Sequence, residues 1–113
     1  MYPHNRSSKN YKLWKKYYSG ATGLFSIVIK SRKKSSVIKF VNSLELFGIG
    51  YSWGGFESLA ILQELRSKKK DEYIQGRQYY RFKDDEHIVR LHIGLEEPKD
   101  LISDLKSCLR YIK

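Results

Sequence analysis

Two short segments carry the residue types that could bind a small molecule. The first, residues 88–93, reads IVRLHI and alternates like a β-strand. Alternation gives one strand face to Val89, Leu91 and Ile93 and the other face to Ile88, Arg90 and His92. A mid-strand guanidinium is costly unless it meets an anion or open water, and its shape suits a bidentate bond to a carboxylate. Arg90 is therefore a candidate carboxylate-binding residue; the alternatives are a structural ion pair or an exposed position. His92 is interpreted as structural.

The second segment is a glycine-rich stretch, residues 48–55, which reads GIGYSWGG and holds four glycines in eight positions. Such a backbone can turn tightly and present Tyr51, Ser52 and Trp53 on a loop. Polar and aromatic groups on a loop of this kind fit a binding site. The alternative, a turn with core aromatics, is favoured by the residues alone.

The surrounding pattern predicts the elements that position these segments. A strand is expected over 24–30 and a helix with Val37, Ile38, Val41 and Leu44 on one stripe, capped by Ser35 or Ser36 and ended by Gly48. A last helix opens at Pro98 and carries Leu101, Ile102, Leu105, Cys108, Leu109 and Ile112. We also expect a short helix over 10–18, a short strand over 49–52, a sharp turn at 54–55, a helix over 58–66 and a polar stretch over 67–86.

This order predicts one α+β domain over residues 1–113. It is a two-layer sandwich in which helices cover one face of a small, mainly antiparallel sheet and leave the other face free. The length of 113 residues allows one core, and no apolar run is long enough to cross a membrane. Cys108 is the only cysteine, which excludes an internal disulfide and favours a cytoplasmic setting. No metal site is predicted.

Charge is distributed unevenly along the chain. The net charge is +10, and residues 1–44 contain ten Lys or Arg and no Asp or Glu. This asymmetry makes a nucleic-acid-binding module an alternative function. A solvated basic surface is favoured over it, because the charges do not share one helical face and no nucleic-acid-binding motif is present; at most weak, sequence-independent binding is expected.

Three motifs in order resemble the transsulfuration family of pyridoxal-phosphate enzymes. The family's Ser-x-Gly-Gly-x-Glu-Ser-Leu signature matches residues 52–59, and its Arg-x-x-x-Gly-x-Glu signature matches residues 90–96, followed by an Asp- and Leu-rich helix at 100–105. Residues 20–26, GATGLFS, resemble the lead-in to the first strand of the family's C-terminal domain. The likeness runs from Pro3 to Lys113 with a poor match over 67–86. Trp53 and the Arg-Leu-His-Ile string are most like the cystathionine β-lyase branch.

The resemblance implies a role for each residue of the two segments. Arg90 would hold the substrate α-carboxylate, Ser52 would hydrogen-bond near the Schiff-base lysine, Trp53 would line the carboxylate-binding site, and Tyr51 would lie beside it. The family reaction cleaves cystathionine to homocysteine, pyruvate and ammonia with pyridoxal phosphate as electron sink.

The large cofactor-binding domain, with its lysine, is absent from this chain. The fragment is therefore expected to be inactive alone and to bind no cofactor. Met1 directly precedes the region of resemblance, which favours a split or degraded gene or the expression of one domain. A split enzyme docking on a separately encoded large domain, and a homo-oligomer, remain open.

Overall fold

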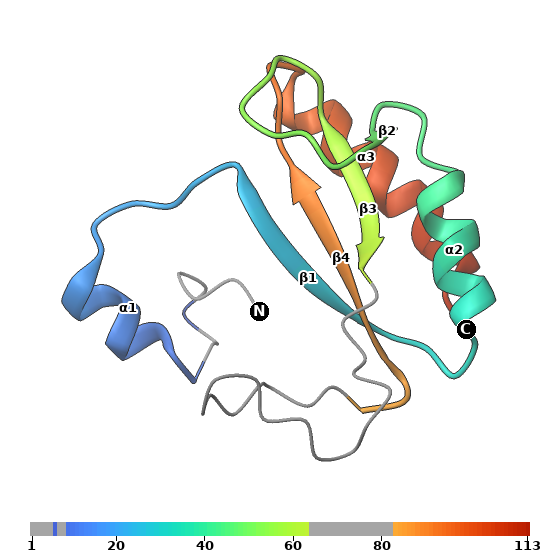
Figure 1. The fold of residues 1–113 in the computed structure, drawn as a ribbon, viewed down its shortest axis with the longest axis horizontal. Helices are drawn as coiled ribbons and strands as arrows, with labels where there is room; N and C mark the ends of the chain where they lie inside the picture. The colour runs from blue at the N-terminus through green and yellow to red at the C-terminus, as the bar shows by residue number, and fades with distance from the viewer. Residues whose placement is uncertain (1–5, 7–8, 64–82) are drawn as a thin grey trace.

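The computed structural model of the chain describes residues 6, 9–63 and 83–113 (Figure 1). A short helix precedes a four-stranded sheet on which two further helices pack. The elements are α1 (Tyr11–Tyr17), β1 (Leu24–Lys30), α2 (Lys34–Asn42), β2 (Gly48–Ile49), β3 (Leu59–Gln63), β4 (Glu86–His92), α3 (Pro98–Cys108) and a closing 3₁₀ turn, η1 (Leu109–Tyr111). The expected stretch over 67–86 falls mostly outside the described residues; its last residue, Glu86, begins β4.

The sheet has the order β1-β4-β3-β2 and is mixed. β4 pairs antiparallel with β1 and with β3, whereas β2 runs parallel to β3. The predicted α+β class is confirmed, and so are the strands over 24–30 and 88–93 as β1 and β4. β4 is an inner strand, so that Arg90 stands between Ser26 of β1 and Ile61 of β3.

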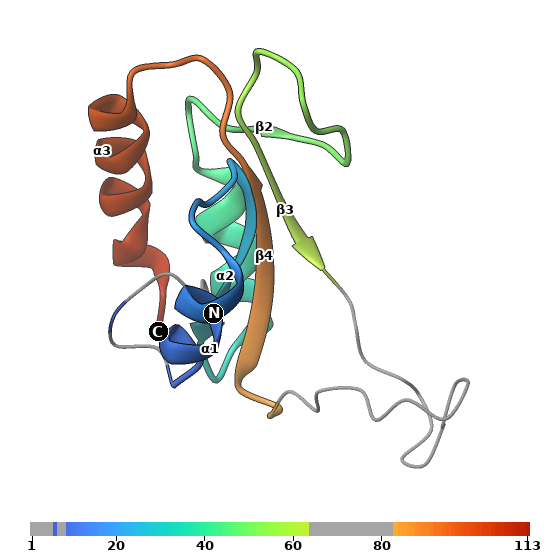
Figure 2. The same cartoon turned by 90° about the vertical axis from the view of Figure 1, so that its left-hand side faces the viewer.

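The core lies between the sheet and the helices α2 and α3, which occupy the same side of the sheet (Figure 2). Phe40 of α2 is 1% exposed, and Val89 and Leu91 of β4 are wholly buried against it in the same apolar cluster. Alternation along β4 was therefore predicted correctly. Burying side chains of this size is the main favourable contribution to folding, about 1.5–3 kcal/mol each.

The opposite face of the sheet is less open than predicted. Ile61, Ile88 and His92 project there and are all buried. His92 is covered because the loop between β2 and β3 folds back over it, with the Gly55 carbonyl oxygen 3.1 Å from its Nε2.

The predicted helix over 58–66 is wrong, because residues 59–63 form β3. The run Leu59-Ala60-Ile61-Leu62 is apolar throughout and has no period of its own. Pairing with β4 on one side and β2 on the other decides its conformation. The expected strand over 49–52 is shorter than predicted and covers only 48–49.

The predicted ends of α2 are also wrong. The helix begins at Lys34, with Lys33 as N-cap and no side-chain cap, so Ser35 and Ser36 lie inside its first turn. It ends at Asn42, and Gly48 instead begins β2. The cause lies in residues 43–47, where the buried Asp104 carboxylate of α3 accepts hydrogen bonds from the backbone N–H groups of Glu45 and Leu46 at 2.9–3.1 Å.

Helix α3 follows the predicted stripe in part. Pro98 occupies its first turn as expected, and Leu101 and Cys108 are buried. Ile102 and Leu109 are exposed, because the stripe that faces α2 is narrower than the sequence pattern. The Cys108 thiol donates to the Ser43 carbonyl oxygen at 3.1 Å, a second tie between α3 and the end of α2.

Replacing Asp104 should destabilise the domain measurably. Asp104→Ala removes the acceptor of two backbone N–H groups and is expected to lower the free energy of unfolding by about 1–3 kcal/mol. Urea denaturation followed by circular dichroism measures the loss. Ser103→Ala, at the exposed neighbouring position, serves as the matched control and should change stability by less than about 0.5 kcal/mol. Equal stability of the two variants would contradict the described role.

Candidate carboxylate-binding site

Arg90 projects from the middle of β4 on the sheet face opposite α2 and α3. Its side chain is half-buried, and its Nη2 donates a hydrogen bond to the Tyr51 carbonyl oxygen. The Tyr51 ring lies beside the guanidinium, with its centroid 5.8 Å from Cζ. Among the described residues, no carboxylate forms an ion pair with Arg90. A guanidinium with one backbone partner retains donors for an incoming anion.

The loop over 50–57 presents the other predicted residues beside this arginine. The side chains of Tyr51, Ser52 and Trp53 are exposed, with 70% of Tyr51 and 68% of Trp53 accessible. The structure thus brings Tyr51 into contact with Arg90 and places Ser52 and Trp53 next along the same loop. The alternative of core aromatics is wrong, because neither ring is buried.

The loop turns at Gly54, whose φ of 81° lies in the left-handed region that favours glycine. The following carbonyl, that of Gly55, accepts a hydrogen bond from His92 Nε2 at 3.1 Å. A carbonyl can only accept, so His92 carries its proton on Nε2. His92 Nδ1 is buried without a hydrogen-bond partner. His92 is therefore a support of the loop, as its structural interpretation predicted.

The end of the loop is fixed by a network around Ser58, which we call the Ser58–Glu96 clamp. Ser58 is 1% exposed; its N–H donates to Glu96 Oε1 at 2.9 Å and its hydroxyl donates to Glu96 Oε2 at 2.7 Å. The same hydroxyl accepts from the Gly94 N–H at 2.8 Å, and the Leu95 N–H donates to the Phe56 carbonyl at 2.8 Å. A Cβ on Gly94 would lie 2.1 Å from the Phe56 oxygen, so this approach requires glycine.

The clamp also acts on the charge of Glu96. The hydrogen bond from the Ser58 backbone N–H, followed by that from the Ser58 hydroxyl, lowers the pKa of the Glu96 carboxyl from its ordinary value of 4.5. The charged form is therefore favoured in the folded chain. Sequence reasoning assigned no role to Ser58, Gly94 or Glu96, although all three belong to the two motifs.

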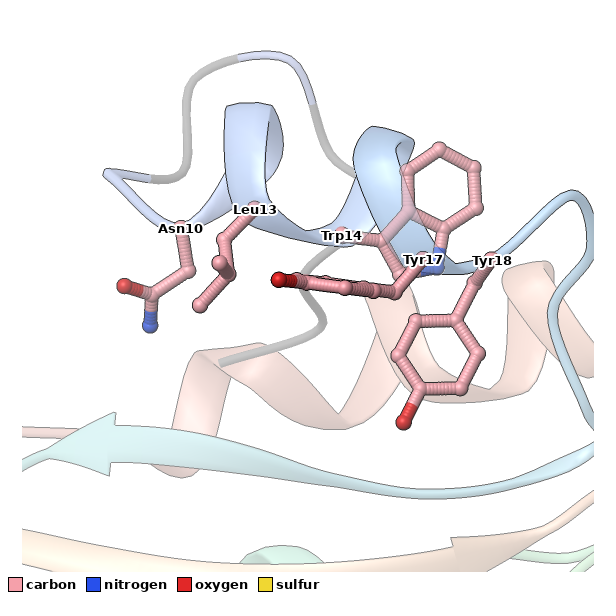
Figure 3. Close-up of a pocket in the computed structure, with 5 residues that line it drawn as sticks. All are labelled: Asn10, Leu13, Trp14, Tyr17 and Tyr18. Carbon is pink, nitrogen blue, oxygen red and sulfur yellow. The ribbon is translucent and has the colours of Figure 1, made fainter.

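A hollow on α1 lies apart from these residues. It is lined by Asn10, Leu13, Trp14, Tyr17 and Tyr18 (Figure 3). These side chains supply apolar surface, two hydroxyls, an amide and an indole N–H, and no carboxylate or cation, so no charged group lines the hollow. Within the described residues there is no cluster of metal-ligating side chains, and no helix is long and apolar enough to cross a bilayer.

Around Arg90 the described residues offer little that suits pyridoxal phosphate. The cofactor needs a lysine amine for its aldehyde and a cradle for its phosphate. Around Arg90 the described contacts come from a backbone carbonyl and an aromatic ring, and no lysine is among them. His92 is buried, and its Nε2 is hydrogen-bonded to the Gly55 carbonyl oxygen. We therefore derive no chemical step through the cofactor on this chain.

Comparison with known proteins identifies the family. The model of the Cys/Met metabolism PLP-dependent enzyme family matches residues 1–110. The chain is 42% identical over 97 residues to a cystathionine β-lyase of Bordetella avium, covering 86% of this chain and 22% of that protein. The chain belongs to this family of enzymes of cysteine and methionine metabolism.

Other relatives show how wide the family is. An L-alanine/L-glutamate racemase of Wolbachia pipientis is 34% identical over 110 residues, 96% of this chain and 26% of that protein. A solved structure described as an O-acetylhomoserine (thiol)-lyase of Campylobacter jejuni, with a pyridoxyl-lysine phosphate residue, superposes with a TM-score of 0.65 at 28% identity, over 96% of this chain and 22% of that one. The chain spans about a quarter of the length of the proteins it matches.

Arg90→Ala should leave the stability of the chain almost unchanged. The side chain is half-buried and its described hydrogen bond goes to one backbone carbonyl, so a loss within about 1 kcal/mol is expected. Leu91→Ala, at the wholly buried next position, should cost about 2–5 kcal/mol. Urea denaturation of the two variants makes the comparison. A loss on Arg90→Ala as large as on Leu91→Ala would contradict a ligand-binding arginine.

The lowered pKa of Glu96 predicts a specific acid sensitivity. A carboxyl whose pKa is lower in the folded chain contributes stability that is complete above its ordinary pKa of 4.5 and is lost as the pH falls through the lowered value. Glu96→Gln should remove this part of the pH dependence, so that the stability difference between parent and variant shrinks below pH 4.5. Unfolding midpoints measured across the acid range test it. Glu97→Gln, at the exposed neighbour, should follow the parent curve; a Glu96→Gln curve parallel to the parent at every pH would refute the assignment.

Proposed function

We propose that the chain is the C-terminal, two-layer domain of a cystathionine β-lyase and supplies the side of the active site that binds the substrate carboxylate. The observation that carries the proposal is the accessible guanidinium of the half-buried residue Arg90, which has a backbone partner and no described carboxylate partner. Its remaining donors suit a bidentate, charge-assisted bond to an α-carboxylate. Pyridoxal phosphate would supply the electron sink, from the part of the relatives that this chain does not match.

Each loop residue takes a proposed role from its position. Ser52 is exposed and follows Tyr51, so its hydroxyl is available to hydrogen-bond a group brought by the rest of the enzyme. Trp53 would form a wall beside the carboxylate, and Tyr51 would orient Arg90 through its carbonyl and ring. The exposed rings fit a site that is half complete in this chain. The chain alone is expected to hold no cofactor and to release no pyruvate.

The choice of the β-lyase branch rests on the relatives. The Bordetella protein is a named cystathionine β-lyase and shares 42% identity with this chain, more than the racemase shares. We accordingly propose that the enzyme is cytoplasmic. This domain would act together with a large domain that belongs to the same chain or is encoded separately.

Nucleic-acid binding is the less favoured alternative. Of the ten basic residues in the first 44 positions, five lie before or on α1 and five lie from the end of β1 into α2, and Figure 1 shows α1 and α2 on opposite sides of β1. They therefore form two separate groups of charge, whereas a nucleic-acid backbone is usually followed by a continuous basic surface.

A chimaeric enzyme tests the proposed function. The matching C-terminal region of the Bordetella protein would be replaced by this chain, and pyruvate release from cystathionine measured with pyridoxal phosphate present. We expect an active chimaera in which Arg90→Ala raises KM at least about tenfold, because a charge-assisted carboxylate contact is lost.

Arg32→Ala, an exposed arginine at the β1–α2 turn, is the matched control and should leave KM unchanged. A folded, cofactor-loaded chimaera that releases no pyruvate would overturn the proposed function. An active chimaera whose KM is insensitive to Arg90→Ala would overturn the role of Arg90 alone.

A further inference from the structure

We infer that Glu96 is a positioning residue for Arg90, acting through Ser58 and the loop over 50–57. The functional meaning of this inference rests on the proposed function, because Arg90 is the group that would meet the substrate. Its structural content rests on the Ser58–Glu96 clamp and on three further contacts between the loop and the end of β4.

Five residue contacts join the two segments. Tyr51 meets Arg90, Gly55 meets His92, Phe56 meets Leu95, and Ser58 meets both Gly94 and Glu96. The loop is therefore pinned at intervals along its length. Arg90 is the guanidinium of this series, and its side chain retains donors for an external anion.

Glu96 is the member of the series on which the others depend most. The Ser58 N–H and hydroxyl are both buried and both donate to its carboxylate, so removing it leaves two buried donors unsatisfied. The Ser58 hydroxyl is also the acceptor for the Gly94 N–H, so its reorientation disturbs the close approach of residues 56–57 to Gly94. Without the clamp, the loop end is freed and the Tyr51 carbonyl no longer has a fixed position over the guanidinium.

A purely structural role makes a different prediction. If Glu96 only stabilised the whole domain, its loss would affect every hydrogen-bonded amide through global unfolding. A positioning role is local, because the clamp lies at one end of the sheet while the core between β4 and α2 is formed by Phe40, Val89 and Leu91. The two roles are therefore separated by measuring individual residues.

The test uses amide hydrogen exchange and side-chain NMR on the chain itself. In Glu96→Ala, the Ser58, Gly94 and Leu95 amides should exchange about tenfold faster or more, the effect of losing one hydrogen bond to a charged group. The Val89 and Leu91 amides should keep the parent rates. In the parent, the fixed contact with the Tyr51 carbonyl and ring should shift the Arg90 Nε–Hε signal away from the position of a free arginine. In Glu96→Ala this signal should move back toward the free position.

Glu96→Gln keeps one acceptor and should give an intermediate result, which guards against a Glu96→Ala variant that fails to fold. Glu97→Ala, at the exposed neighbour, should match the parent in every signal. An unchanged Arg90 signal in Glu96→Ala with a folded core, or equal acceleration of all amides, would overturn the inference. Neither result depends on enzyme activity, so a failed chimaera and a failed clamp are distinguishable.

In the active chimaera, the same substitution provides a second readout. Glu96→Ala should raise KM for cystathionine more than it lowers kcat, because Arg90 loses its orientation while the part of the chimaera that would hold the cofactor is unchanged. A lower kcat with an unchanged KM would contradict a role in carboxylate positioning.

Discussion

The geometry of the candidate site depends on one buried polar residue, Ser58, whose hydrogen-bonding groups must all be satisfied without water. Its side chain and backbone contact Glu96, Gly94 and Gly48, which come from two separate parts of the chain. Satisfying them forces the segments 56–58 and 94–96 so close together that Gly94 has no room for a side chain. This close approach fixes the position of the C-terminal end of the loop that carries Tyr51, Ser52 and Trp53.

Secondary structure was predicted correctly from the sequence where the local residue pattern and the tertiary packing favour the same conformation. Alternation along 88–93 predicted both the strand and the face of Arg90, and Pro98 predicted the start of α3. The apolar run at 59–62 was misread as helix, since a run without polar interruption has no period, and the partners β2 and β4 that decide its conformation are remote in sequence. The end of α2 was missed for a similar reason: Asp104, about sixty residues away, shapes the loop that follows.

The residues of the candidate site were likewise predicted only in part. Residue type and family resemblance singled out Arg90, Ser52, Trp53 and Tyr51, because their side chains have recognisable chemistry. Glu96 and Ser58 stood in the same motifs and received no role, since a surface glutamate and a serine are common and their contact becomes visible only when both segments are placed. Nothing in the pattern of residues 90–96 indicates that Glu96 would reach back to Ser58.

The position of β4 in the sheet has a consequence for how the chain folds as it is synthesised. Of the four strands in the described sheet, β4 leaves the ribosome last, yet it is the strand with which β1 and β3 both pair. Until it emerges, those two strands have open edges and no partner between them, a state prone to association with other nascent chains. The sheet must then form by insertion of a late strand between two earlier ones, a route dominated by contacts distant in sequence and therefore intrinsically slow.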